Sequence, residues 1–189
     1  MIRIALDLEL EQPNTNPQTP DSWTDVERII QVGYCVFNDQ TGEFLRERLF
    51  HVYYEDPLSE FIQKLTGITN EDVRDGFDIE YVLDFLNKDR ETFQASRKLL
   101  TWGGGDQPAL MRENLFPQDW AFGRSAFNVK HLYQLYEEQT GGNPSGGLKK
   151  CCNRLGIKRS GRAHNALVDA KDTASLFMEI LKRTEYKRS

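Results

Sequence analysis

The sequence has no long apolar run and contains few cysteines and histidines. Its 189 residues include 3 Cys and 3 His. No stretch approaches the roughly 20 apolar residues that a membrane span needs, and a strand-like segment follows Met1 with no apolar leader. Cys35, Cys151 and Cys152 fit neither a disulfide framework nor a zinc-ligand spacing. We therefore expect buried thiols, no membrane association and a cytoplasmic location.

The chain also lacks an overall excess of positive charge. Its formal net charge is −5, whereas surfaces that bind phosphate are usually basic. The charge is unevenly distributed, because residues 145–189 contain 11 Lys and Arg against 4 Asp and Glu. This last quarter is a candidate phosphate-facing surface, and a solvated helix with a basic end is the alternative.

Composition and length favour one domain spanning residues 1–189. Apolar runs predict strands at 2–8, 29–37, 44–53 and 98–102. Helical spacing predicts two or three short helices within 57–86, then helices at 107–115, 127–136, 148–155 and 165–181. The proline-rich stretch 11–25 predicts a loop. Strands first, then strands alternating with helices, favour an α/β fold with helices around a mixed five-stranded sheet.

An acidic pair ends the first predicted strand. Asp7 and Glu9 are two residues apart, so their side chains leave the same face of that strand. Together they can share one divalent cation, and phosphodiester chemistry commonly uses two such ions about 3.5 to 4 Å apart. A solvated acidic edge is the competing interpretation. The apolar neighbours Leu6 and Leu8 favour burial, which requires a counter-charge.

Three further residues are candidates for the same chemistry. Asp106 follows three glycines at the bend between a predicted strand and a predicted helix. His164 comes just before the last predicted helix, and Asp169 falls one turn inside it. A carboxylate and an imidazole in this arrangement can bind a metal ion and take a proton from water. For His164 alone, a histidine bonded to the backbone at a helix start is an equal alternative.

In their order along the chain, these segments resemble the successive motifs of the DEDDh 3′-to-5′ exonucleases of the RNase H-like superfamily. The matching segments are Asp7-Leu8-Glu9, Leu65-Thr66-Gly67-Ile68-Thr69, Thr101-Trp102-Gly103 up to Asp106, and Gly161-Arg162-Ala163-His164 through Asp169. Pro57-Leu58-Ser59 and the spacing from Trp102 to Asp106 are most similar to the histone-mRNA 3′-end exonuclease and sporulation-inhibitor-like branch.

The resemblance implies an RNase H-like fold and an exonuclease that releases nucleoside 5′-monophosphates. It implies that two Mg²⁺ ions, replaceable by Mn²⁺, are held by Asp7, Glu9, Asp106 and Asp169. It assigns His164 as general base. The backbone that would cradle the 3′-terminal nucleotide belongs to Leu8, Leu10, Thr66, Gly67 and Ile68.

The sequence departs from the family pattern at Leu10, where many relatives have Thr, so a hydroxyl near the substrate end is missing. Glu11 and Asp172 are additional acids, which we expect at the surface or behind the ligands, and Trp102 is expected in the core. The implied partner is the 3′ end of single-stranded nucleic acid, with RNA slightly favoured over DNA. A catalytically silent binding domain and a proofreading subunit of a polymerase are the alternatives.

Overall fold

The computed structural model describes residues 1–12, 27–112, 121–123, 125–159 and 161–186. The strands are β1 (Ile2–Glu11), β2 (Arg28–Asn38), β3 (Phe44–His51), β4 (Leu100–Thr101) and β5 (Phe127–Asn128). The helices are α1 (Glu60–Thr66), α2 (Asn70–Arg74), α3 (Ile79–Thr92), α4 (Asp106–Arg112), α5 (Val129–Thr140), α6 (Leu148–Arg154) and α7 (Ala166–Tyr186). Among these helices, none is long and apolar enough to cross a membrane.

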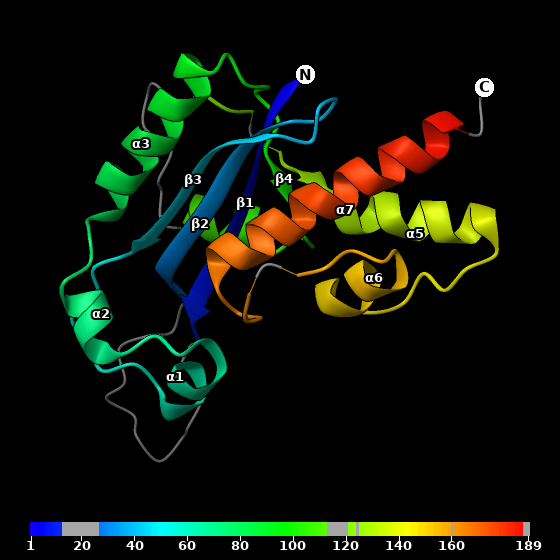
Figure 1. Ribbon diagram of the computed structural model, residues 1–189. Coiled ribbons are helices and arrows are strands. Elements are labelled where there is room, and N and C mark those ends of the chain that lie inside the picture. The colour runs from blue at the N-terminus through cyan, green and yellow to red at the C-terminus, as the bar shows by residue number, and fades with distance from the viewer. Residues whose placement is uncertain (13–26, 113–120, 124, 160, 187–189) are drawn as a thin grey trace.

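The five strands form one mixed sheet in the order β3-β2-β1-β4-β5. The first three strands are antiparallel neighbours, while β4 runs parallel to both β1 and β5. Figure 1 shows α3 on one side of the sheet and α7 crossing the other side, with α5 and α6 beside it. The predicted mixed five-stranded sheet flanked by helices is confirmed.

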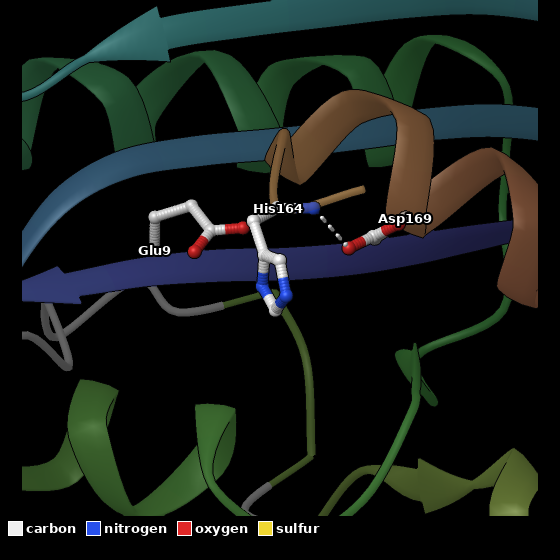
Figure 2. Close-up of side chains that lie close together, drawn as sticks. All are labelled: Glu9, His164 and Asp169. Carbon is white, nitrogen blue, oxygen red and sulfur yellow. Dashed lines mark hydrogen bonds between the residues drawn. The ribbon is translucent and has the colours of Figure 1, made fainter. Parts of the chain in front are cut away.

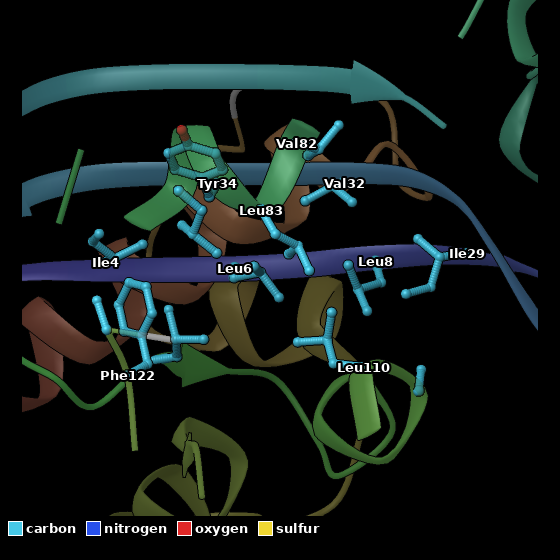
Figure 3. Close-up of a cluster of buried hydrophobic side chains, with 14 of the residues drawn as sticks. Ile4, Leu6, Leu8, Ile29, Val32, Tyr34, Val82, Leu83, Leu110 and Phe122 are labelled. Atoms are coloured by element: carbon cyan, nitrogen blue, oxygen red, sulfur yellow. The ribbon is translucent and has the colours of Figure 1, made fainter. Parts of the chain in front are cut away.

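Alternation along β1 divides its side chains between two cores. Ile4, Leu6 and Leu8 pack with α3 and α4 residues such as Leu83 and Leu110, as Figure 3 shows. Ala5 faces the opposite way, into a second cluster made with α5, α6 and α7. Because strand side chains alternate with a period of two, Asp7 and Glu9 also lie on the α7 side of the sheet.

The start of α7 lies directly on β2. Gly33 faces it, and a Cβ at that position would overlap the backbone of Ala166 and Leu167. The side-chain carbonyl of Gln31 accepts a hydrogen bond from the Ala166 backbone N–H at 2.9 Å. Gly33 is also the β2 partner of Asp7, so this contact sets the first turn of α7 over the acidic end of β1.

Several boundaries differ from the sequence prediction. Phe127 and Asn128, predicted as the start of a helix, form β5 and pair with Leu100 and Thr101. Asn128 then caps α5, because its side chain accepts a hydrogen bond from Lys130 N. The predicted strand at 98–102 shortens to two residues. Glu11 extends β1 instead of opening a loop, and residues 13–26 of the predicted loop lie outside the described residues.

The predictions for the apolar residues are confirmed where the structure describes them. Cys35, Cys151 and Cys152 are all buried and free. Trp102 packs against the second core, with its ring centroid 6.2 Å from that of Tyr133. It therefore belongs to the packing between β4 and α5.

Gly33→Ala should destabilise the protein by about 1–3 kcal/mol or more, since the added methyl group forces the helix start away from the sheet. Urea unfolding followed by circular dichroism would measure the change. Gly104→Ala is the matched control, because a Cβ there meets no atom within 4 Å. Equal stability of the two variants would contradict the close contact between α7 and β2.

Candidate active site

Glu9, His164 and Asp169 come together at the end of β1. One ligand atom from each lies within 4.8 Å of the other two. Figure 2 shows Glu9 extending from β1 and Asp169 from the first turn of α7, with His164 between them in this view. Residues that are more than 150 positions apart in the sequence therefore share one small volume, as the predicted site requires.

Asp7 of β1 and Asp106 at the start of α4 belong to the same cluster of acids. The negative charges of Asp106, Glu9 and Asp169 all act on Asp7. The Leu8 backbone N–H donates to Asp106 Oδ1 at 3.2 Å, which fixes the start of α4 beside β1. Asp106 and Glu9 are each only 8% exposed. Four carboxylates are thus gathered where β1, α4 and α7 meet, and few of their oxygens face bulk water.

Burial and mutual repulsion make these carboxyl groups hard to ionise. Burial, followed by the negative charges of Asp106, Glu9 and Asp169, raises the pKa of Asp7 well above its usual value. Burial and the same kind of repulsion raise the pKa of Glu9 to about 8. Burial also raises the pKa of Asp106, although its hydrogen bond from Leu8 acts in the opposite direction. A bound divalent cation would supply the positive charge that this cluster needs.

The segment before α7 is held in an unusual conformation. His164 has a φ of 60°, in the left-handed region that residues with a side chain rarely adopt. Its backbone N–H donates to Asp169 Oδ2 at 3.1 Å, so helix and loop are tied together. Strained backbone is concentrated at functional sites, where the surrounding structure maintains it. The exposed His164 side chain thus stands at the rim of the acidic cluster.

Two arginines anchor this segment to its surroundings. Arg159 pairs with both Asp169 and Asp172. Arg162 donates to the carbonyls of Lys64 and Leu65 at 2.9 and 3.2 Å, in the last turn of α1. The loop that carries His164 is therefore tied on one side to α7 and on the other to α1.

The turn after α1 is the segment that the resemblance assigns to the nucleotide. Gly67 ends α1 in the left-handed conformation, with a φ of 81°. The side chains of Thr66 and Ile68 are buried, and the Thr66 hydroxyl accepts from Ile68 N at 3.1 Å. Leu8 points into the first core and Leu10 is half-buried against it. Because the side chains of Thr66, Ile68 and Leu8 are buried, this region can contact a ligand mainly through its backbone atoms.

Of the two locations predicted for Glu11 and Asp172, the surface is wrong, since these residues are only 4% and 2% exposed. Glu11 accepts a hydrogen bond from Ser59 N at 2.9 Å and so links the end of β1 to α1. Asp172 shares Arg159 with Asp169. Asp172 therefore lies behind the acidic cluster, which is the other position that the sequence allowed.

Sequence reasoning did not identify Gly33, Gln31 or Arg159 as parts of the site, and it named Arg162 within a motif without giving it a role. Gly33 carried a usable signal, because a glycine inside an apolar strand often marks a close approach of backbone. The two arginines belonged to a basic segment that could equally be solvated. Their partners lie on α1 and α7, and only the tertiary structure brings these together.

Comparison with known proteins gives one family and one fold. The model of the exonuclease family, RNase_T, matches residues 4–177. A curated relative, ERI1 exoribonuclease 2 of Mus musculus, is 27% identical over 180 residues, which cover 82% of this chain. The human counterpart is 25% identical over 182 residues. The chain spans about a quarter of the length of these relatives, 25% and 26% respectively.

Two solved structures share the fold. One is the nuclease domain of 3'hExo, a DEDDh family member, bound to rAMP, with a TM-score of 0.77, 23% identity and coverage of 96% of this chain and 92% of that one. The other is S. pombe Pop2p in its Mg²⁺- and Mn²⁺-bound form, with a TM-score of 0.65, 20% identity and coverage of 95% and 82%.

Without metal ions, the protein should lose stability as pH rises from 4.5, the ordinary pKa of a glutamic acid, to about 8. In this range the folded state binds a proton at Glu9 more tightly than the unfolded chain does, so deprotonation favours unfolding. Glu9→Gln should make the slope shallower by up to about 1.4 kcal/mol per pH unit. Urea unfolding in a chelating buffer across this range would measure both slopes.

The control for this measurement is Glu138→Gln, which changes an exposed acid on α5. It should leave the slope of the parent protein unchanged. A Glu9→Gln variant with the parental slope would show that Glu9 ionises as freely in the folded protein as in the unfolded chain.

Proposed function

Since the chain belongs to the exonuclease family of DEDDh type, we propose that it is a metal-dependent 3′-to-5′ exonuclease that hydrolyses single-stranded nucleic acid to nucleoside 5′-monophosphates. The observation that carries the proposal is the convergence of Asp7, Glu9, Asp106, Asp169 and His164 at one end of the sheet. We propose that residues 1–189 act as a single exonuclease domain.

The donor set fits hard divalent cations. Mg²⁺ prefers carboxylate and water oxygens, which is what the four acids provide. The raised pKa values of Asp7, Glu9 and Asp106 support this choice, because they indicate a cluster that is short of positive charge in the absence of metal. The proposed ions are two Mg²⁺, with Mn²⁺ able to replace them, and the Pop2p structure with both kinds of ion bound supports this choice.

In the proposed mechanism Asp7, Glu9 and Asp169 would hold one ion, and Asp106 together with Asp7 would hold the other. Two ions in such a site activate the attacking water and neutralise charge on the scissile phosphate. His164 takes the proton from that water, for which its exposed position beside Glu9 and Asp169 is suitable. The buried carboxylates keep the reacting groups in a fixed arrangement, because burial and their hydrogen bonds restrict their rotation.

We propose that the 3′-terminal nucleotide of the substrate binds at the turn formed by Thr66, Gly67 and Ile68 and along the backbone of Leu8 and Leu10. The turn is close to the cluster, because Arg162 ties it to the loop carrying His164. RNA is proposed slightly ahead of DNA. The relatives named exoribonuclease and the rAMP bound to the 3'hExo nuclease domain support this order.

A domain of this fold that binds nucleic acid without cleaving it is the second candidate. It would keep the core and the basic last quarter of the chain but would not need ionisable groups at all five positions. The presence of all four acids and the histidine in one place favours catalysis. A proofreading subunit would share the chemistry and differ only in binding a polymerase.

The direct experiment is digestion of 5′-labelled single-stranded RNA and DNA with Mg²⁺, Mn²⁺ or a chelator. We expect a ladder that shortens from the 3′ end and disappears with the chelator. Folded protein that binds the oligonucleotides and leaves them intact with either metal would instead support the binding domain.

Asp106→Asn should abolish turnover and keep the fold. The amide oxygen can still accept the hydrogen bond from Leu8 N, so only the charge needed for the second ion is lost. Asp84→Asn, an exposed acid on α3, is the matched control. Turnover of Asp106→Asn within a few-fold of this control would remove Asp106 from the proposed site.

His164→Ala should lower kcat by about 10² to 10⁴, the range that a general base contributes. The rate should recover partly at high pH, where hydroxide replaces the missing base. His51→Ala, on the edge strand β3, serves as control. A parental rate at neutral pH would assign proton transfer to another group.

A further inference from the structure

Arg159 is buried between two acids of α7. Its side chain is 11% exposed, and those of Asp169 and Asp172 are 14% and 3% exposed. One edge of the guanidinium group reaches Asp169 Oδ1 through Nη2, and its Nε reaches Asp172 Oδ2. The arginine therefore bridges a proposed metal ligand and an acid that lies behind the cluster.

This bridge completes the support of the Asp169 carboxylate. Its Oδ1 is held by Arg159 and its Oδ2 by the backbone N–H of His164, at 3.1 Å. A carboxylate bonded through both oxygens cannot rotate freely about its side-chain bonds. One lone pair of each oxygen is used by these contacts, which leaves the other available to a cation beside Glu9.

Asp172 in turn fixes the arginine. A guanidinium group is planar and carries its donors in a rigid fork, so two bound carboxylates define its orientation. Asp169 and Asp172 are three residues apart and lie on the same side of α7. Arg159 comes from the segment before the helix, so the bridge also fixes how that segment approaches the site.

We propose that Arg159 is a positioning residue, anchored by Asp172, that orients Asp169 for metal binding. This inference rests on the proposed function. Partners of this kind typically change metal affinity or activity by about 10- to 100-fold when they are removed. If Arg159 instead only occupied the place of the metal ion, its removal would strengthen metal binding and not weaken it.

The measurement is Mn²⁺ binding by titration calorimetry in the absence of nucleic acid, beside the Mg²⁺ dependence of RNA digestion. The variants are Arg159→Met, Arg159→Lys and the double variant Arg159→Met with Asp172→Asn. The double variant removes both charges together, so it is informative even where Arg159→Met alone fails to fold. Arg183→Met, which breaks a pair with Glu179 on the same helix, is the control.

We expect the double variant to bind Mn²⁺ about 10- to 100-fold more weakly than the control, with an equal rise in the Mg²⁺ concentration for half-maximal digestion. Arg159→Lys should recover part of the affinity, since it keeps the charge but not the fork. Thermal unfolding in a chelating buffer separates this effect from a general loss of stability.

Metal affinity that is unchanged or higher in the folded double variant would overturn the positioning role, whatever its melting temperature. Parent protein that binds no Mn²⁺ and digests nothing would overturn the proposed function, and this inference with it. Failure of the positioning role is distinguishable from failure of the proposed function, because in the first case the parent protein still binds Mn²⁺ and digests RNA.

Discussion

The contact between the first turn of α7 and Gly33 of β2 is the constraint on which the site depends. A strand position without a side chain lets the helix backbone approach the sheet directly, and Gln31 fixes the helix start with a hydrogen bond. Because Gly33 pairs with Asp7, this approach places the start of α7 over the acidic end of β1. The position of Asp169 relative to Glu9 follows from it, because Asp169 lies in the first turn of α7.

The gathering of acids opposes folding, and the structure offsets that cost in several ways. Burial and mutual repulsion raise the pKa values of Asp7, Glu9 and Asp106, which favours their uncharged forms when no cation is present. The single positive charge of Arg159 is shared between Asp169 and Asp172 and offsets part of their negative charge. Binding of a divalent cation would replace the repulsion between these carboxylates by attraction.

The basic last quarter of the chain is only partly a surface feature. Several of its cations hold the structure together: Arg159 pairs with acids of α7, Arg162 caps the carbonyls of α1, Lys171 pairs with Glu47 of β3 and Arg183 pairs with Glu179. By contrast Lys149, Lys150 and Lys158 are exposed. The uneven charge along the sequence therefore reflects internal pairing as well as exposed cations.

The sequence by itself determined the mixed α/β fold, most strands and helices, and the residues of the acidic cluster. The strands and helices were readable because periodicity is a local property, whereas the complete set of acidic residues followed from the resemblance of the motifs to those of the DEDDh exonucleases. It did not locate β5, which consists of two residues that are strand only because Leu100 and Thr101 lie beside them. Only the tertiary structure decided the burial of Glu11 and Asp172 and the partners of Arg159 and Arg162. Burial and pairing depend on which distant segments meet, and no pattern within one segment encodes that.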